Sequence, residues 1–353
     1  MTVETDSLRV LSSEDFFKKA TLQERAFFLL KYAILAPSTH NSQPWLFNVS
    51  DDGLCMIYAD LSKYLPEGDK DRRDMFLSVG CAIENFRTAT LYFNAFDAIS
   101  FFNSKPENNL QLIAELRIKH SVAPSNDESI KRRFEAITKR VNARGMFENA
   151  PITPAVRVAL DMIELEDGVS VYVADSDADK KTIAELTAEG LRFAHSSKSF
   201  RKELSLWVRD LGRSKPDGIP WYGLKVPFPV SLFIAEFLRA FNMSSVLAPL
   251  NEKSIISASR AVIFLSKNDS FEDWIKVGMS AERMMLEAWA HGLKTSVFVA
   301  AIEMPELRKQ LREFLKTYLL PQFHFVIGFM DEKFKFTTRH PVEAKLYNEK
   351  KYF

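Results

Sequence analysis

The residues best suited to hold a polar ligand occur in one short segment, residues 29–47, with the sequence LLKYAILAPSTHNSQPWLF. A helix is expected to end at Pro37, because proline lacks the amide hydrogen that a helix interior needs. Residues 38–43 then offer hydroxyl and amide groups with little side-chain bulk, before a strand that opens with Pro44 and Trp45. Loops held by rigid elements in this way often carry binding residues. The alternative is a capped turn that only joins the helix to the strand.

Basic residues gather in a second segment, residues 136–154, which we call the basic segment. Lys139, Arg140 and Arg144 place three cations within six residues, with Asn142 between them. A guanidinium group can bind two phosphate oxygens at once, so a bend here would form an anion site. The alternative is a solvated basic loop.

Hydrophobic periodicity predicts the elements that must position these two segments. In the first half, helices are expected over residues 13–36, 74–94 and 128–139, and strands over residues 45–49, 54–58, 99–102 and 110–118. In the second half, helices are expected over residues 154–163, 177–195, 202–211, 271–292 and 305–315, and strands over residues 169–173, 261–265, 295–300 and 322–327.

Two of the predicted helices are similar to each other. The segment SVGCAIENFRTATLYFNA aligns with KVGMSAERMMLEAWAHGL, so that Gly80 matches Gly278 and Glu84 matches Glu282. Any two amphipathic helices can align about this well, so the similarity alone leaves an internal duplication open.

The first polar segment resembles a motif of the nitroreductase superfamily. The string A-P-S-x-x-N-x-Q-P-W is similar to the loop with which members of that family reach FMN across a dimer interface. The resemblance implies that Pro37, Ser38, Thr39 and Asn41 contact the cofactor.

The basic segment resembles the R-x-S-x-R-x-F element that holds the FMN phosphate and ribityl chain in that family. Arg140, Asn142 and Arg144 occupy the matching positions. Asn142 stands where serine is frequent and can still donate and accept hydrogen bonds. Phe147 comes one residue late, so its role is not carried over.

Two C-terminal segments extend the resemblance. Residues 323–347 are similar to the closing I-G-[YF] strand and the K-x-R pair that meets the phosphate; Arg339 matches the arginine, and Thr337 stands where lysine is usual. Residues 292–308 are similar to the stretch that passes the flavin ring, which implies contacts from Val297 to Ala300. The Glu-Gly pair frequent at that point is missing here.

The order of these motifs narrows the resemblance to Acg-type nitroreductases, which are internally duplicated chains of about this length. The polar motif lies in the first half and the phosphate element opens the second, as two fused subunits would give after each lost one part. The resemblance covers nearly the whole chain and implies halves at residues 1–135 and 136–353. It also implies a lid over the flavin at about residues 213–250, although that stretch could instead be a fixed part of the core.

The implied fold is α+β, with two nitroreductase-like halves forming a pseudo-dimer around mainly antiparallel sheets flanked by helices. Since the usual dimer would be fused in one chain, we expect a monomer. NAD(P)H would reduce FMN, which would pass electrons to an unknown small-molecule acceptor in a ping-pong cycle, with the chemistry on the cofactor and no catalytic side chain. Two alternatives stay open: a protein that seals FMN under its lid with little turnover, and a nitroreductase-like scaffold that binds no flavin.

Composition limits the other partners. The net charge of +1 argues against nucleic acid or an anionic membrane as a partner. Cys55, Cys81 and six scattered histidines show no metal-like spacing. The first residues resemble no secretion signal, and the longest apolar stretch, residues 226–241, carries Glu236 and Arg239. We therefore expect a cytoplasmic protein with no bound metal.

Overall fold

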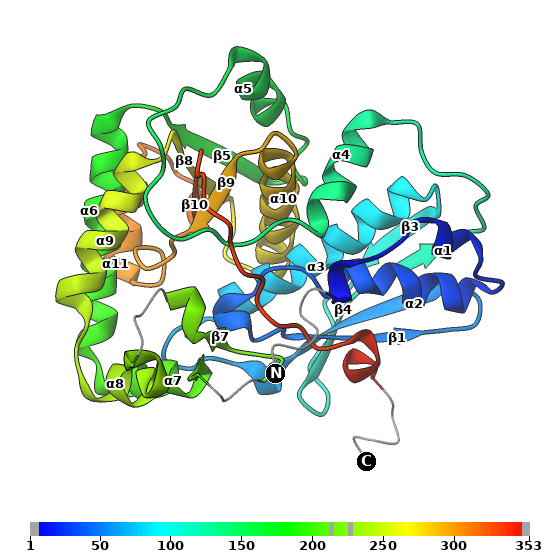
Figure 1. The fold of residues 1–353 in the computed structure, drawn as a ribbon, viewed down its shortest axis with the longest axis horizontal. Coiled ribbons are helices and arrows are strands. Elements are labelled where there is room, and N and C mark those ends of the chain that lie inside the picture. The colour runs from blue at the N-terminus through cyan, green and yellow to red at the C-terminus, as the bar shows by residue number, and fades with distance from the viewer. Residues whose placement is uncertain (1–6, 212–214, 225–228, 348–353) are drawn as a thin grey trace.

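Two antiparallel sheets form the framework of the molecule (Figure 1). The structure is a computed structural model that describes residues 7–211, 215–224 and 229–347. The first sheet has the order β1-β2-β4-β3, with β1 at Trp45–Val49, β2 at Leu54–Asp60, β3 at Phe96–Phe101 and β4 at Leu110–Ile118. The second has the order β5-β8-β10-β9, with β5 at Val169–Ala174, β8 at Arg260–Ser266, β9 at Lys294–Val297 and β10 at Leu320–Gly328. This arrangement confirms the expected α+β class with mainly antiparallel sheets.

Helices lie between and around the two sheets (Figure 1). In the first half they are α1 (Glu14–Phe17), α2 (Leu22–Ala33), α3 (Arg73–Tyr92) and α4 (Glu128–Ile137). In the second half they are α5 (Pro154–Asp161), α6 (Asp177–Ser196), α7 (Lys198–Trp207), α8 (Ile234–Ala240), α9 (Ser244–Ser257), α10 (Phe271–Ala290) and α11 (Pro305–Phe314). Among the residues described, no helix combines the length and the apolar character needed to cross a membrane.

The two central helices, α3 and α10, cross at the glycines that the sequence similarity matched. A Cβ atom added to Gly80 would lie 2.2 Å from the carbonyl oxygen of Ile275. A Cβ atom added to Gly278 would lie 2.2 Å from the carbonyl oxygen of Leu77. Each glycine thus receives the carbonyl three residues before the other, so the two helices contact each other through equivalent positions.

The C-terminal segment returns from the second sheet to the first. After β10 it crosses the molecule (Figure 1), and Leu346 forms a bridge with Phe47 of β1. The amide of Tyr347 donates to the carbonyl of Phe47 at 2.7 Å. Residues 346 and 347 therefore pack on the first half, although most of the described residues from 136 onward surround the second sheet.

Two helix predictions need correction. Residues 13–36 form α1 and α2 rather than one helix, because Thr21 starts a new helix with a capping box: its hydroxyl accepts from the amide of Glu24, and the Glu24 carboxylate accepts from the amide of Thr21. The helix expected over residues 202–211 is α7, which begins earlier because the Ser197 hydroxyl accepts from the amide of Phe200.

The stretch expected to be a lid divides into different environments, and its residues 213–214 and 225–228 lie outside the described residues. The short strand β7 (Ile219–Pro220) pairs in parallel with β6 (Val208–Arg209). Helix α9 packs instead against α6, with Ala248 and Ile255 buried (Figure 1). We call residues 215–224 the covering segment, because this part approaches the site described next.

Candidate functional site

A cavity of about 440 Å³ lies where the two halves meet, and we call it the main cavity. All predicted site residues except Ala300 line it, namely Pro37, Ser38, Thr39, Asn41, Arg140, Asn142, Arg144, Val297 and Arg339. Ala300 lies elsewhere: its carbonyl oxygen would be 2.3 Å from a Cβ atom added to Gly190 of α6. The tertiary structure therefore gathers side chains from segments far apart in the sequence around one space.

The polar loop, residues 37–43, has an unusual backbone. His40, Asn41 and Gln43 all have positive φ angles, of 52°, 56° and 53°. Such conformations are costly for residues with side chains and persist only where the surroundings hold them. The stabilising contacts come from the covering segment and the C-terminal segment.

Asn41 is the anchor of this loop. Its amide nitrogen donates to the carbonyls of Gly218 at 3.1 Å and Thr338 at 3.0 Å, and its amide oxygen accepts from Arg339 at 2.7 Å. The backbone carbonyl of Asn41 also accepts from the amide of Gly218. These bonds use both amide hydrogens of the side chain, so Asn41 shapes the loop from within the protein.

Gln43 joins the same three segments. Its side-chain nitrogen donates to the carbonyl of Pro216 at 2.7 Å, and its side-chain oxygen accepts from the amide of His340 at 2.9 Å. Lys345 donates to its backbone carbonyl at 2.6 Å. Gln43 is fully buried, and sequence reasoning did not select it, although the motif contains it.

Arg140 and Arg339 are held inside the protein. Arg140 is only 2% exposed, forms an ion pair with Glu282 at 2.9 Å, and donates to the carbonyl of Leu35 at 3.1 Å. Arg339 donates to the carbonyl of Ala36 at 3.0 Å as well as to Asn41. Burial lowers the pKa of Arg339 to about 9, and the nearby charge of Arg140 acts in the same direction.

Arg144 has a different environment. Its side chain is solvent-exposed because it lines the cavity, and protein atoms surround it closely enough that burial lowers its pKa. Among the described residues, none forms an ion pair or hydrogen bond with it. Burial also lowers the pKa of neighbouring His40 to about 4, helped by the charge of Arg144, so His40 adds no charge at neutral pH. Arg144 is thus a cation at the cavity wall, and the part of the chain that the structure describes supplies no counter-ion to it.

Three further cations line the cavity that sequence reasoning did not select. Lys333 and Lys335 come from the C-terminal segment, and Lys335 lies 5.7 Å from the ring of Tyr222. Arg9 lines it too and donates to the carbonyl of Thr138 at the end of α4, at 2.9 Å. The grouping of Lys333 and Lys335 with Arg339 was a usable signal, because it places three cations within seven residues.

The rest of the lining is mainly apolar. Its side chains come from α3, α10, the covering segment and the stretch around β9, including Leu77, Met285, Ile219, Val297 and Val299. Asn142 joins the basic segment to this wall, because its side-chain oxygen accepts from the amide of Val297 at 2.9 Å. A largely apolar lining with a few polar groups is typical of a site for a small organic ligand, and such sites have volumes of about 300–1,000 Å³.

Sequence comparison finds relatives that are named as NAD(P)H nitroreductases. The chain is 25% identical over 320 residues to a Mycobacterium tuberculosis protein named as the NAD(P)H nitroreductase acg, covering 89% of this chain and 92% of that protein. It is 23% identical over 291 residues to a second M. tuberculosis protein named as an NAD(P)H nitroreductase, covering 80% and 78%. This similarity supports the nitroreductase superfamily. No protein-family model matches the chain.

Solved structures are more distant. Nitroreductase A from Vibrio parahaemolyticus has a TM-score of 0.38 and 12% identity over 62% of this chain and 75% of that chain. The FMN-dependent nitroreductase NfnB from Mycobacterium smegmatis in complex with NADPH has a TM-score of 0.35 and 17% identity over 57% and 88%. Likeness at this level adds no support to that of the sequence relatives.

Proposed function

We propose that the protein is an FMN-binding oxidoreductase of the Acg-like nitroreductase type, which takes electrons from NAD(P)H and passes them to a small-molecule acceptor in the cytoplasm. The observation that carries this proposal is Arg144, which lines a largely apolar cavity and has no counter-ion among the described residues. Its side chain is open to the cavity, yet the surrounding protein lowers its pKa, so an anionic ligand bound there would stabilise its charge.

The donor set fits FMN. Arg144, Lys333 and Lys335 would hold the phosphate, with Asn142 donating from its free amide hydrogens. Leu77, Met285 and Val299 would face the flavin ring, and the polar loop would border its edge. Bound FMN would supply the hydride chemistry; the chain would bind it, orient it and exclude water.

In this proposal Arg140 and Arg339 position the polar loop that contacts the cofactor. Arg140 holds the carbonyl of Leu35, and Arg339 holds the carbonyl of Ala36, immediately before the polar loop. Together with Glu282 they fix the start of the loop that carries Ser38 and Thr39. Ser38 uses its hydroxyl to accept from the amide of Gln43 at 2.9 Å, which further defines the turn.

The proposed organisation is an internal duplication, with halves at residues 1–135 and 136–353 in a monomer. The equivalent contacts of Gly80 and Gly278 support it, and so do the matched glutamates, since Glu84 pairs with Arg283 at 2.8 Å and Glu282 pairs with Arg140 at 2.9 Å. The two arginines come from non-equivalent positions, as halves that have diverged would allow.

A second candidate function is a flavin-holding protein with little turnover. This function is favoured by the hydrogen bonds that hold the covering segment in place. Gly218 and Asn41 exchange two hydrogen bonds, and Tyr222 donates to the carbonyl of Phe336 at 2.8 Å. Asp217 adds ion pairs to Arg209 at 2.8 Å and Lys63 at 3.5 Å. A covering segment held by these contacts would slow the entry of any substrate into the main cavity.

Two measurements test these functions. The absorbance spectrum of the purified protein should show a flavin, and mass spectrometry of the released cofactor should identify FMN; a colourless protein that takes up no FMN would refute both candidates. Stopped-flow bleaching with NADH and NADPH should be fast for an oxidoreductase. If it is very slow in the native protein and fast in Asp217→Asn, which loosens the cover, the flavin-holding function is favoured.

A further inference from the structure

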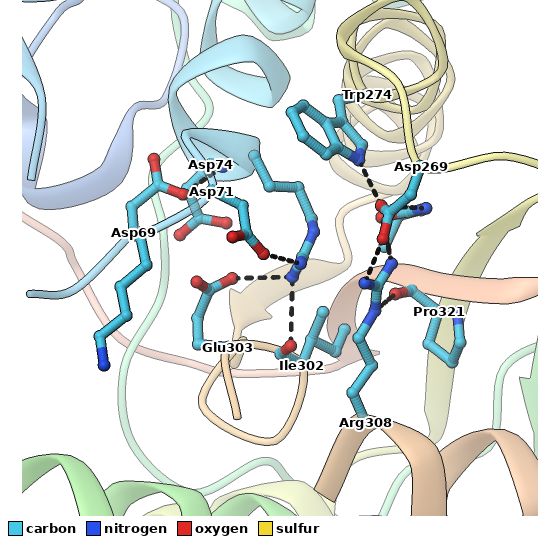
Figure 2. A network of polar contacts seen from close by, with 12 residues as sticks. Asp69, Asp71, Asp74, Asp269, Trp274, Ile302, Glu303, Arg308 and Pro321 are labelled. Atoms are coloured by element: carbon cyan, nitrogen blue, oxygen red, sulfur yellow. Dashed lines mark hydrogen bonds and ion pairs between the residues drawn. The ribbon is translucent and has the colours of Figure 1, made fainter. Parts of the chain in front are cut away.

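Three carboxylic side chains lie close together behind the polar loop. Asp69, Asp74 and Glu303 each place one carboxylate oxygen within 4.8 Å of the other two (Figure 2). Asp69 and Asp74 are 1% and 3% exposed, and the Glu303 side chain is 10% exposed. Nothing in the proposed binding of FMN uses these groups.

The contacts of the three differ. Asp69 is a structural cap, because its two oxygens accept from the amides of Asp74 at 3.0 Å and Met75 at 2.9 Å in the first turn of α3. Glu303 forms an ion pair with Arg73 at 3.2 Å. Asp74 accepts from the hydroxyl of Thr39 at 3.0 Å, while its other oxygen, Oδ1, is buried and has no hydrogen-bond partner.

Asp74 and Glu303 stand between two cavities. Asp74 and Thr39 line the main cavity. Glu303 lines a second cavity of about 230 Å³, together with Arg73, Asp71 and the side of α11 that carries Arg308, Lys309 and Arg312. A carboxyl group of one cavity wall thus lies next to a carboxyl group of the other.

Most cations near Asp74 and Glu303 have other partners or are exposed to solvent. Arg73 is the buried cation beside this pair, and Arg73 also donates to the carbonyl of Ile302 and pairs with Asp71, whose side chain is 62% exposed (Figure 2). Arg308 is held by Asp269 at 2.6 Å (Figure 2). Lys309 and Arg312 are exposed.

Three close carboxylates beside one buried cation do not all ionise together. Burial raises the pKa of Asp69 to about 7 and raises those of Asp74 and Glu303 in the same direction, with mutual repulsion adding to it for Asp69 and Glu303. Burial and mutual repulsion therefore favour a protonated carboxyl group in the cluster.

We propose that Glu303, Asp74 and Thr39 form a proton relay from the second cavity to the acceptor bound in the main cavity. This inference rests on the proposed function. The hydroxyl of Thr39 can accept a proton from Asp74 while it donates its own toward the cavity. Glu303 then returns a proton to Asp74 and is itself reprotonated by water in the second cavity.

Reduction of a quinone acceptor requires a supply of protons. Reduction of a quinone to a hydroquinone consumes two electrons and two protons. A hydride that originates in NAD(P)H brings both electrons and one proton, and the second proton must come from the protein or from water. The relay delivers that proton to the quinone oxygen as the hydride adds to the ring system, so that one quinone, one hydride and one proton give one hydroquinone.

The test compares two acceptors in single-turnover reoxidation of the reduced holoprotein. A benzoquinone takes a proton with its electrons, whereas ferricyanide takes electrons alone. Glu303→Gln and Asp74→Asn should slow reoxidation by benzoquinone by roughly 100-fold, the lower end of the range for general acid catalysis, and leave reoxidation by ferricyanide within about twofold. The matched control is Glu313→Gln, which removes an exposed carboxylate of α11 that lines neither cavity, and it should behave as wild type.

Chemical rescue tests directly whether the carboxyl group of Glu303 supplies the proton. In Glu303→Ala, added acetate should restore part of the benzoquinone rate, because the cations of the second cavity attract an anion into the space left by the side chain. Equal slowing with both acceptors, or no rescue in a variant that melts like wild type, would assign the cluster a purely structural role and overturn the relay.

A measurement without cofactor separates the relay from the proposed function. Infrared spectra of the flavin-free chain near neutral pH should contain a protonated carboxyl band that weakens in Glu303→Gln and Asp74→Asn and shifts in heavy water. A wild-type protein that is reduced by NAD(P)H but lacks this band keeps the proposed function and loses the relay. Tight Mg²⁺ or Ca²⁺ binding that the same substitutions abolish would also overturn it, since the cluster would then be a cation site. Absence of flavin chemistry in the native protein would refute both.

Discussion

At the scale of single residues, Arg140 and Arg144 lie four positions apart and have opposite surroundings. Both side chains line the main cavity, but the Arg140 guanidinium pairs with Glu282 and donates to a carbonyl, whereas that of Arg144 has no ion pair among the described residues. Substitutions at the two positions should therefore have different consequences.

Arg144→Ala should weaken FMN binding by about 1.5–3 kcal/mol, the usual worth of a hydrogen bond to a charged group, with little change in stability. Fluorescence titration of the flavin-free protein measures the affinity. Lys139→Ala is the matched control from the same basic segment, because Lys139 is 68% exposed and its nearest acidic oxygen, on Glu135, is 4.0 Å away. Equal affinity in Arg144→Ala and wild type would show that this cation does not bind the cofactor.

Arg140→Ala should instead destabilise the fold, by about 3–5 kcal/mol, because it leaves the Glu282 carboxylate buried without its partner. Urea unfolding of the flavin-free chain measures this. The double variant Arg140→Met with Glu282→Met removes both charges and should recover much of the loss. A single variant as stable as wild type would contradict the buried ion pair.

His324 should make stability depend on pH. It is 2% exposed on β10, and burial lowers its pKa from 6.5 to about 4. Between these values the folded state binds fewer protons than the unfolded state, so the contribution is complete above about pH 6.5 and is lost as the pH falls toward 4. His40 and His195 shift in the same direction for the same reason.

Urea unfolding across this range should show stability falling on acidification, and His324→Gln should reduce the slope by at most about 1.4 kcal/mol per pH unit. The exposed, non-titrating Gln310 provides the control substitution, Gln310→Asn, which should leave the slope as it is. An unchanged slope in His324→Gln would mean that His324 does not titrate as burial predicts.

At the scale of elements, the crossing of α3 and α10 holds the two sheets together. The helices approach so closely that a Cβ atom at Gly80 would lie 2.2 Å from a backbone carbonyl, which cannot move aside as a side chain would. The main cavity lies beside this crossing, since α3 supplies Leu77, Ser78 and Cys81 and α10 supplies Met285 to its lining. Separation of the helices would therefore alter the cavity.

Gly80→Ala should lower stability by about 1–3 kcal/mol, the usual cost of overpacking, and should also weaken FMN binding. Thermal melting and flavin titration measure the two effects. Gly223→Ala is the control for stability, because its added Cβ would meet only side-chain atoms at 3.8 Å or more. If Gly80→Ala melted like wild type, the close crossing would not be a feature of the protein in solution.

At the scale of the whole molecule, the chain carries one copy of each half of the proposed site. The polar loop occurs only in the first half and the basic segment opens the second. The C-terminal segment, which adds Lys333, Lys335 and Arg339, joins them across the molecule (Figure 1).

This arrangement predicts one FMN per chain in a monomeric protein. Release of flavin by denaturation, quantified against protein concentration, measures the ratio, and light scattering measures the mass. Two FMN per chain would contradict the single composite site. The mass is a demanding test, because Phe193 on α6 and Phe233 and Phe241 at the two ends of α8 are 67%, 66% and 56% exposed and offer apolar surface for association.

Local patterns in the sequence were sufficient for the α+β class, for most strands, and for the segments that line the main cavity. Alternating apolar residues mark β4, and the three- and four-residue spacing of Met75, Phe76, Val79 and Ile83 marks α3, because these periods depend only on backbone geometry. The helix start at Thr21 was missed because periodicity was read across it, and the helix capped by Ser197 was expected to begin only at residue 202.

Only the tertiary structure decided which charged groups are free and which are bound. Arg144 and Arg140 look alike in sequence, and the partner that separates them, Glu282, lies on a distant helix. Arg339 reaches Asn41 across 298 positions. The two cavities and the carboxyl pair between them arise in the same way, from α3, the polar loop and the stretch before α11. Burial and counter-ions depend on which remote segments pack together, and spacing along the chain carries no information about that.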